Sequence, residues 1–366
     1  MEKQLGIRLS DYKMKVLYAN LLFGDHIFGH KNLDTNILKA LKDISDVYLI
    51  CPVGWYPFPD PKINQIQYSE NKIYGKNRFT YYLTVVSNIY RAIRADRKNK
   101  FDYIIFASYD TILGCLLSFF KHSKTRVFVI QHENLDQISM SGKTRFFFNL
   151  YKNLINHFVF ELFIKEYMAK ELGVQENKIT VLPHPVNIVK KDRERRYDCV
   201  AISNSNNEEL IQKLLEIQKT QRIFEKKKKK IIMRSRKIEY DDGYLKIFRG
   251  FIDESEYDEI IGNAKRLYLP YPDSFRQRVS GNLVDALSNH ISVIGSDIPV
   301  FNFYAEKYPG ICHVTNRIED VIRMIIQGED TGLQTDNEFN KFVEEHSLEA
   351  VKESLSNIIK GDFGNE

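Results

Sequence analysis

The chain has 366 residues, 43% of them hydrophobic, which is too long for one ordinary hydrophobic core and suits two packed domains. A net charge of +5 is mild, so it neither excludes nor demands an anionic substrate or membrane surface. The cysteines are far apart, without zinc-type spacing or a disulfide framework, which favours a reducing cytoplasm. Residues 1–12 are polar, unlike a signal peptide, and no apolar run approaches the ~20 residues of a membrane-spanning helix. We therefore expect a cytoplasmic protein whose membrane contact, if any, is peripheral.

The first half of the chain alternates between predicted strands and helices. A strand at 15–22, a loop at 23–30, a helix at 33–44 and a strand at 47–51 are the usual opening of a parallel, doubly wound domain. The loop lacks the GxGxxG spacing, which argues against dinucleotide binding. Residues 52–74 contain four prolines and are expected to form a long irregular loop. Further strands are predicted at 102–106, 126–130, 158–160 and 180–182.

A hinge is predicted where this alternation stops. Residues 183–187 read Pro-His-Pro-Val-Asn, and a charged run follows at 190–196. Prolines stiffen such a connection and charges keep it solvated. A second alternation then begins, with strands predicted at 199–202, 231–234, 245–248 and 266–269. We therefore predict two α/β domains, at residues 1–187 and 188–366.

Residues 276–287, Arg-Gln-Arg-Val-Ser-Gly-Asn-Leu-Val-Asp-Ala-Leu, carry the densest chemical pattern. Ser280 is a good helix N-cap, and Gly281 lets a ligand approach the backbone closely. The free N–H groups and partial positive charge at a helix start suit a phosphate. Asp285 follows on the same helix face, where its carboxylate could bind ring hydroxyls. The pattern predicts a nucleotide-sugar site, against the simpler interpretation of a capped core helix with a surface aspartate.

Several segments together resemble the nucleotide-sugar glycosyltransferases with the GT-B fold, in particular the retaining group called family four. The matching segments are residues 171–183, 248–257, 267–272 and 289–299. The resemblance implies two Rossmann-like domains facing each other across a cleft, with the C-terminal helix returning to the first domain. It also implies a nucleoside-diphosphate sugar donor in the second domain and a saccharide or lipid-linked saccharide acceptor in the first. No cofactor is expected, and the transfer should be independent of metal.

The family signature is two glutamates separated by seven residues, and this chain carries a variant of it. Asp285 occupies the second position, which in the family binds the donor ribose, and Gln277 stands at the first. The variant reads Arg-x-Ser-Gly-x-x-x-Asp. The family also places an arginine and a lysine after the first strand of the second domain. Here that segment, residues 203–207, has neither, and Arg234 or Arg236 could supply the charge instead.

The resemblance assigns roles to residues at matching positions. His132, which ends a buried strand, would face the reacting sugar, and Arg276 and Arg278 would stabilise the departing diphosphate. The simpler alternatives are a strand-end histidine bonded to backbone and two solvated loop arginines. Donor contacts are expected from Gly250, Phe251, Ile252, Tyr271, Ser280, Gly281, Asn282 and Asp285. Gly24 and His26 would form an acceptor or phosphate loop.

Two basic segments raise the question of other partners. Residues 144–154 mix basic and aromatic residues at helical spacing, which is compatible either with docking on an anionic membrane or with a packed core helix. The lysine run 226–230 has no interleaved aromatics, so nucleic acid is not an expected partner.

The sequence predicts a glycosyltransferase that acts in bacterial surface polysaccharide or glycoconjugate biosynthesis, in the cytoplasm or at the inner face of the cell membrane. The alternatives are a GT-B nucleotide-sugar epimerase and a catalytically silent GT-B binding protein.

Overall fold

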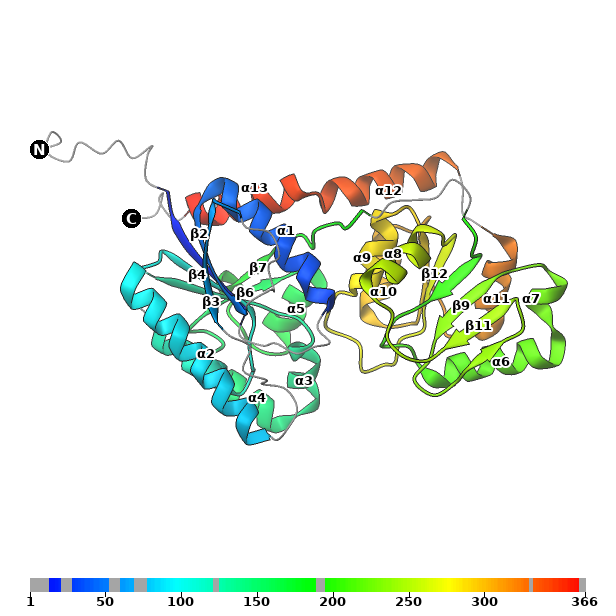
Figure 1. The fold of residues 1–366 in the computed structure, drawn as a ribbon, viewed down its shortest axis with the longest axis horizontal. Helices are drawn as coiled ribbons and strands as arrows, with labels where there is room; N and C mark the ends of the chain where they lie inside the picture. Colours follow the sequence, from blue (N-terminus) through cyan, green and yellow to red (C-terminus); the bar gives the residue numbers. More distant parts are fainter. Residues whose placement is uncertain are drawn as a thin grey trace, which may run out of the picture. The chain divides into compact units, whose positions relative to one another are not determined.

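The computed structural model describes residues 13–20, 28–52, 60–68, 78–120, 125–188, 195–328 and 332–361 (Figure 1). The chain forms two compact units. Unit 1 comprises Met1–Pro185 together with Leu348–Glu366, and unit 2 comprises Val186–Ser347. The predicted division at residues 187 and 188 differs from these units chiefly at the C-terminus, because the last helix belongs to unit 1.

The described strands of unit 1 form a seven-stranded sheet in the order β3-β2-β1-β4-β5-β6-β7. Neighbouring strands pair in parallel throughout this sheet. Because helices cover both faces of a parallel sheet, its strands are nearly continuous apolar runs, and Val16, Leu17 and Phe106 are fully buried. The strands are β1 (Lys15–Asn20), β2 (Asp46–Pro52), β3 (Ile63–Tyr68), β4 (Tyr103–Ser108), β5 (Arg126–Ile130), β6 (Asn156–Val159) and β7 (Ile179–Val181).

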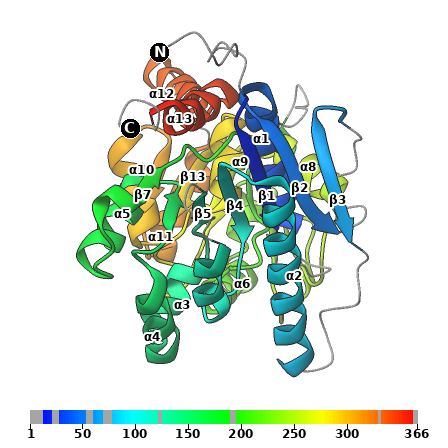
Figure 2. The ribbon, with the colours of Figure 1, turned by 90° about the vertical axis from the view of Figure 1, so that its left-hand side faces the viewer.

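The direction of each crossover decides which face of this sheet a helix covers. Right-handed connections place α2, η2, α3, α4 and α5 on one face, and α1 on the other because the chain steps from β1 to β2 in the opposite direction (Figure 2). Helix α13 packs against α1, so the C-terminal helix returns to the first domain as predicted. These elements are α1 (Phe28–Ile44), α2 (Arg78–Asn99), η2 (Leu113–Phe120), α3 (Asn134–Met140), α4 (Gly142–Tyr151), α5 (Leu162–Lys170), η3 (Glu176–Lys178) and α13 (Leu348–Gly361).

Unit 2 has a second seven-stranded sheet within its described residues, ordered β10-β11-β9-β8-β12-β13-β14. All neighbours are parallel except the short edge strand β10, which is antiparallel to β11. Its strands are β8 (Cys199–Ala201), β9 (Ile231–Arg234), β10 (Tyr240–Asp241), β11 (Leu245–Phe248), β12 (Arg266–Leu269), β13 (Ser292–Gly295) and β14 (Cys312–Val314).

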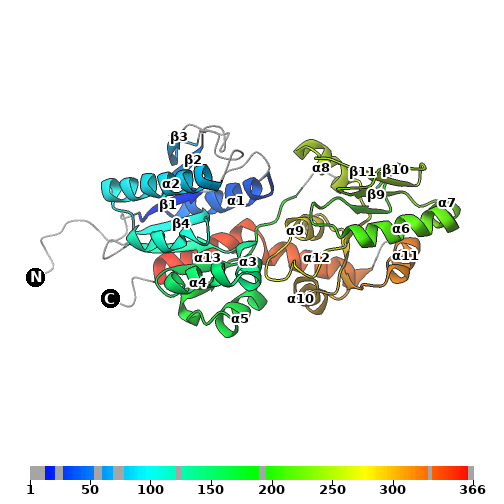
Figure 3. The same cartoon turned by 90° about the horizontal axis from the view of Figure 1, so that it is seen from below.

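Helices cover both faces of the second sheet (Figure 3). The crossovers α8, α9 and α10 lie on one face, and α6 lies on the other, with α11 packed beside it. Helix α12 packs against α9. The helices are α6 (Glu208–Gln221), α7 (Ile223–Lys226), α8 (Glu254–Gly262), α9 (Gly281–Ser288), α10 (Pro299–Lys307), α11 (Ile318–Gln327) and α12 (Leu333–Glu345).

Strand β3 was not predicted, because the whole of residues 52–74 was expected to be irregular. It pairs in parallel with β2, from Ile63 opposite Val47 to Tyr68 opposite Pro52. Ile63 is buried while Asn64 is exposed, which is the alternation of a half-covered strand. Polar residues are tolerated here because β3 lies at the edge of the sheet. The prediction was wrong because the preceding prolines and the polar side chains hid a short period-two pattern.

The described cysteines are not joined in disulfides, and Cys51, Cys199 and Cys312 are buried. Burial raises the pKa of the Cys199 thiol to about 12, so this thiol stays protonated at neutral pH. Among the described residues, no helix combines the length and the apolar character needed to cross a bilayer.

Candidate functional site

Helix α9 begins at the carboxyl edge of the unit 2 sheet, after the loop that follows β12. Ser280 is its N-cap, with extended backbone angles, and its Oγ accepts a hydrogen bond from the Leu283 N–H at 3.3 Å. Gly281 is exposed, and a Cβ added there would meet no atom within 4 Å. The helix start therefore offers backbone N–H groups next to open space, which is the arrangement that suits a phosphate.

Five side chains form a hydrogen-bonded cluster around this helix start. The Tyr271 hydroxyl lies 2.9 Å from Ser280 Oγ and accepts a hydrogen bond from Asn282 Nδ2 at 3.3 Å. The Tyr257 hydroxyl lies 2.7 Å from Asn282 Oδ1 and 2.8 Å from Asp285 Oδ2. Tyr257 comes from α8, Tyr271 from the loop after β12, and the other three from α9 or its cap. The structure thus brings Tyr271, Ser280, Asn282 and Asp285 together, and it adds Tyr257.

Asp285 lies in an environment that disfavours its charged form. Burial raises the pKa of this carboxyl to about 6, with a smaller contribution from Asp258, while hydrogen bonds from Tyr257 and Asn187 oppose the rise. A phenol has one hydrogen, so Tyr257 cannot donate fully to both Asn282 and Asp285. A carboxylate has about four acceptor positions, and Asp285 can therefore accept further hydrogen bonds from the hydroxyls of a ligand.

Arg234 brings a buried cation to the end of β9. Its side chain is 8% exposed, and its guanidinium lies over the Phe251 ring, 4.8 Å from the centroid. Burial lowers the pKa of this arginine. Among the described residues, no carboxylate lies within 4.0 Å of its guanidinium nitrogens. Arg236 differs, because Glu208 Oε1 accepts from its Nε at 3.3 Å and from its backbone N–H at 2.8 Å. Arg234 is therefore the better placed of the two to meet an anion.

Residues 203–207, which lack the arginine and lysine of the resembling family, have structural roles. Asn206 Nδ2 donates to the carbonyls of Ala201, at 2.8 Å, and Arg234, at 3.0 Å, so it ties the ends of β8 and β9 together. Asn207 caps α6 by accepting from the Glu209 N–H at 2.9 Å. Ser203 forms a side-chain hydrogen bond with Tyr271, which connects this segment to the cluster.

The two loop arginines differ in their exposure. Arg278 is half-buried, and its guanidinium lies 4.0 Å from the centroid of the Phe275 ring. Phe275 in turn packs against Tyr271, with ring centroids 4.4 Å apart. Burial raises the pKa of Tyr271, and the charge of Arg278 counteracts this rise, as does a hydrogen bond from Ser203. Arg276 is exposed, and Gln277 between them is half-buried.

In unit 1, His132 follows the carboxyl end of β5. Its backbone N–H donates to Asn134 Oδ1 at 2.8 Å, and its ring centroid is 5.4 Å from that of Phe160. Gln131 Oε1 accepts from Asn134 Nδ2 and from the Tyr109 hydroxyl, while Gln131 Nε2 lies 2.6 Å from His157 Nδ1. A buried hydrogen-bond network therefore fixes the backbone that carries His132.

His157 at the centre of this network is neutral and has a defined tautomer. Burial lowers its pKa to about 4. Its Nε2 lies 2.7 Å from the Lys152 carbonyl, which can only accept, so Nε2 carries the proton and Nδ1 accepts from Gln131. Nothing in the sequence pattern predicted this role, because His157 only precedes the short strand expected at residues 158–160.

The remaining predicted site residues lie in the loop between β11 and α8 or outside the described residues. Gly250 lies between β11 and α8 with a φ of 102°, a conformation that favours glycine, and Phe251 beside it is exposed. Ile252 follows in the same loop and is half-buried. Gly24 and His26 lie outside the described residues. His132 belongs to unit 1, whereas all the described donor-site candidates belong to unit 2.

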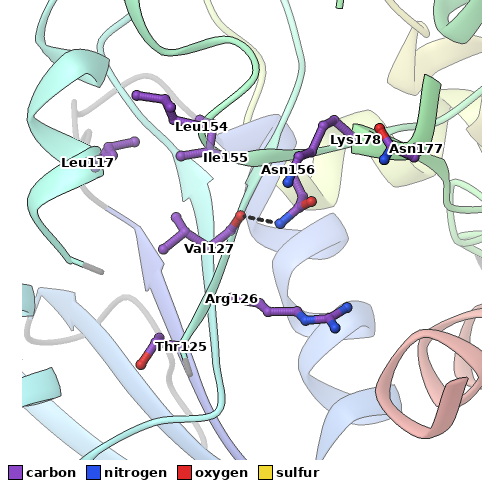
Figure 4. Close-up of a pocket in the computed structure, with 9 residues that line it drawn as sticks. All are labelled: Leu117, Thr125, Arg126, Val127, Leu154, Ile155, Asn156, Asn177 and Lys178. Carbon is purple, nitrogen blue, oxygen red and sulfur yellow. Dashed lines mark hydrogen bonds between the residues drawn. The ribbon is translucent and has the colours of Figure 1, made fainter. Parts of the chain in front are cut away.

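A hollow of about 460 Å³ in unit 1 is lined by residues other than the predicted site residues (Figure 4). Arg126, Asn156 and Lys178 line it, at or next to the amino ends of β5, β6 and β7. His132 stands at the opposite edge of the same sheet. Asn156 is already engaged there, since its Nδ2 donates to the Val127 carbonyl at 3.1 Å. Because ligands of open α/β sheets bind at the carboxyl ends of strands, this hollow is not the expected site.

No family model matches the chain, and no curated protein matches it in sequence. Solved structures do match it in fold. The lipopolysaccharide outer core galactosyltransferase WaaB is 13% identical, with a TM-score of 0.61, and 95% of this chain and 100% of that one are covered. Anabaena HepE, in complex with UDP and glucose, is 11% identical with a TM-score of 0.64, covering 95% and 99%. Sucrose-phosphate synthase from Thermosynechococcus elongatus is 9% identical with a TM-score of 0.66, covering 97% and 100%. These matches extend over both units, and the chain therefore has the GT-B fold.

Proposed function

We propose that this protein is a glycosyltransferase that moves a sugar from a nucleoside-diphosphate sugar to a hydroxyl acceptor. The observation that carries the proposal is the cluster of Tyr257, Tyr271, Ser280, Asn282 and Asp285 at the start of α9. It combines an amide-rich helix start with a carboxylate, which are the groups that a diphosphate and a ribose diol require. The UDP complex of HepE, which shares the fold, makes UDP-sugars the first donors to test.

The donor would lie along the carboxyl edge of the unit 2 sheet. Asp285 would accept hydrogen bonds from the ribose hydroxyls, and residues 250–252 would flank the base. The N–H groups at Gly281 and Asn282 would face the diphosphate. Arg234, which is buried without a carboxylate partner among the described residues, would supply the positive charge that residues 203–207 lack. Arg278 and Arg276 would extend that charge along the loop.

The reaction would be a transfer at the anomeric carbon of the donor sugar. The acceptor hydroxyl oxygen forms a bond to that carbon, and the bond from the carbon to the diphosphate oxygen breaks. The diphosphate leaves with the electron pair and takes up the acceptor proton. Negative charge grows on the leaving oxygens, where Arg278, Arg276 and the helix start would stabilise it. His132 in unit 1 would contact the sugar, and unit 1 would bind the saccharide or lipid-linked acceptor.

Further properties belong to the same proposal. We propose a retaining outcome, transfer without a metal ion, and a role in bacterial surface polysaccharide or glycoconjugate biosynthesis in the cytoplasm. The cations on unit 2 support independence from metal, because arginines can neutralise a diphosphate where other sites use a divalent ion. We also propose a contact with the inner face of the cell membrane.

The test of the donor site is the affinity for UDP-glucose of the Asp285→Asn variant, measured by titration calorimetry. We expect the affinity to fall roughly 10- to 100-fold, because hydrogen bonds to a charged group contribute about 1.5–3 kcal/mol each. The matched control is Asp273→Asn, which changes an exposed aspartate of the same unit and should leave affinity unchanged. Unchanged affinity in the Asp285 variant would remove this residue from the donor site.

The same preparation distinguishes the alternatives by their products. Transfer requires an added acceptor, whereas an epimerase would convert the donor with no acceptor present. A catalytically silent protein would bind UDP-sugars without turnover of either kind.

A further inference from the structure

Helix α2 presents an apolar stripe on its outer face. Phe79 is 70% exposed, Leu83 54%, Val86 40% and Tyr90 62%. These residues are spaced by four, three and four positions, so they lie along one side of the helix. The opposite side carries the buried residues Val85, Ile89 and Ala92 and packs on unit 1. Packing in the core accounts for the apolar side chains on the buried side of α2. It does not account for the apolar stripe on the exposed side.

The same helix is strongly basic. Within residues 78–99 there are five arginines and lysines and one acidic residue, Asp96. Asp96 is buried and accepts a hydrogen bond from the Phe101 N–H, so it does not offset the charge on the outer face. Arg94, Arg97 and Lys98 are exposed and continue the helix after the apolar stripe.

Helix α4 repeats this combination. Its buried side carries Phe148 and Tyr151, whereas Phe146 is 60% exposed and Leu150, one turn further on, is 53% exposed. Lys143 and Arg145 are exposed on the same helix, and residues 142–154 contain no acidic residue. The core and membrane interpretations of this segment are therefore compatible, because each accounts for one side of the helix.

The two helices belong to one face of unit 1. Both pack against η2, and the crossover directions put all three on the same side of the sheet (Figure 2). We name this the α2–α4 surface, defined by the apolar residues Phe79, Leu83, Val86, Tyr90, Phe146 and Leu150 and by the cations Arg94, Arg97, Lys143 and Arg145. Unit 2 differs, because its exposed large apolar residues within the described part, Ile188, Phe251 and Leu333, are isolated from one another in sequence.

We propose that the α2–α4 surface docks on an anionic lipid bilayer. Apolar side chains at helical spacing can enter the boundary between head groups and acyl chains, while arginines and lysines beside them attract anionic head groups. A second copy of this chain fits less well, because a self-complementary interface would bring like-charged arginine and lysine side chains together. The inference concerns the location of the protein and does not depend on the proposed glycosyl transfer.

The experiment is co-sedimentation of the full-length protein with vesicles of phosphatidylcholine, with or without phosphatidylglycerol. We expect binding to the anionic vesicles only, weakened by salt. The double variant Leu83→Glu with Tyr90→Glu should reduce binding at least tenfold, because it removes apolar contacts and adds negative charge. Arg94→Gln with Arg97→Gln should reduce it roughly 10- to 30-fold, at about 1 kcal/mol for each cation. The control is Leu333→Glu, which changes an even more exposed leucine in unit 2, at 79%, and should bind like the unchanged protein.

Three results would overturn the proposal. The first is equal binding to neutral and anionic vesicles, and the second is binding that the α2 variants do not reduce. The third is a native mass of a dimer that Leu83→Glu converts to a monomer, without vesicle binding by either, which would make this surface an interface between copies. The assay contains neither donor nor acceptor, so its outcome is independent of the UDP-glucose titration that tests the proposed function.

Discussion

At the scale of single residues, the proposed donor site depends on Asp285, whose buried position disfavours the ionised carboxylate. Burial raises its pKa, so ionising this carboxyl at neutral pH costs the folded state free energy relative to the unfolded chain. Hydrogen bonds from Tyr257 and Asn187 recover only part of that cost, since the pKa remains raised. A carboxylate kept in an unfavourable site is what a binding function would explain, because ligand hydroxyls complete its hydrogen bonding.

This position predicts a pH dependence of donor binding. With a pKa of about 6, Asp285 is mostly ionised above pH 7 and mostly protonated below pH 5. Ribose hydroxyls donate better to the carboxylate, so affinity for UDP-glucose should be constant above about pH 7 and fall as pH decreases through 6, by at most about tenfold per pH unit. Calorimetric titration between about pH 5 and pH 8 measures this change. In Asp285→Asn the dependence should disappear, and a wild-type profile that is flat across this range would contradict the assignment.

At the scale of elements, helix caps fix where ligand-binding groups lie. Ser280 caps α9 and also contacts Tyr271, so the same hydroxyl ends the loop and joins the cluster. In unit 1, a buried hydrogen-bond network at the start of α3 has a comparable role. It is formed by Gln131, Asn134 and His157, and Asn134 accepts from the backbone N–H of His132 and so fixes its position. His132 stands directly after a strand, whereas the unit 2 cluster stands at a helix start after a loop. In both units, polar side chains from other elements determine the local geometry.

Ser280 gives a prediction at this scale. Ser280→Ala removes the cap and the Tyr271 contact, so the free energy of unfolding of unit 2 should fall by about 1–2 kcal/mol, and donor affinity should fall as well. Ser141→Ala is the matched control, since Ser141 caps α4 with its Oγ at the same 3.3 Å from a backbone N–H, that of Thr144. It should cost about 1 kcal/mol in unit 1 and leave donor affinity unchanged. Chemical denaturation and calorimetry measure the two quantities, and a normal donor affinity in Ser280→Ala would separate the cap from the site.

At the scale of the whole molecule, the chain leaves unit 1 near Pro185, forms unit 2, and returns to unit 1 with α13. Val351 and Leu355 on this helix are buried, and Lys352 lies 3.8 Å from Asp43 of α1. The exposed ion pair contributes little to stability, because such pairs are screened by solvent. The apolar side chains therefore hold the C-terminal helix on unit 1, and the first domain is built from both ends of the chain.

Leu355→Ala tests this arrangement. Removing a buried leucine side chain should lower the free energy of unfolding by about 2–5 kcal/mol, and the loss should appear in unit 1. Hydrogen exchange should accelerate in α1, against which α13 packs, while β12 and β13 of unit 2 keep their protection. Leu348→Ala, at a position that is already exposed at the start of the same helix, should have a small effect. Faster exchange in unit 2 but not in α1 would contradict the assignment of α13 to unit 1.

Much of the fold could be predicted from local patterns. Alternating apolar runs and capped helices predicted the two α/β domains, and the Ser280-Gly281 pair predicted the start of α9, because periodicity and capping are read within one element. Strand β3 was missed, since an edge strand needs only one covered face and its polar residues carry a weak signal. Gly24 and His26 stay predictions, as they lie outside the described residues.

The sequence by itself determined the fold class, the helix start of the candidate donor site and the carboxylate on its face, since each depends on residues close together in the chain. Only the tertiary structure decided which distant residues meet there. It placed Tyr257 from α8 against Asp285, left Arg234 buried without a carboxylate partner among the described residues, and paired Arg236 with Glu208. It also placed the exposed apolar side chains of α2 and α4 on the same face of unit 1. These contacts depend on strand order and crossover direction, which a local pattern does not contain.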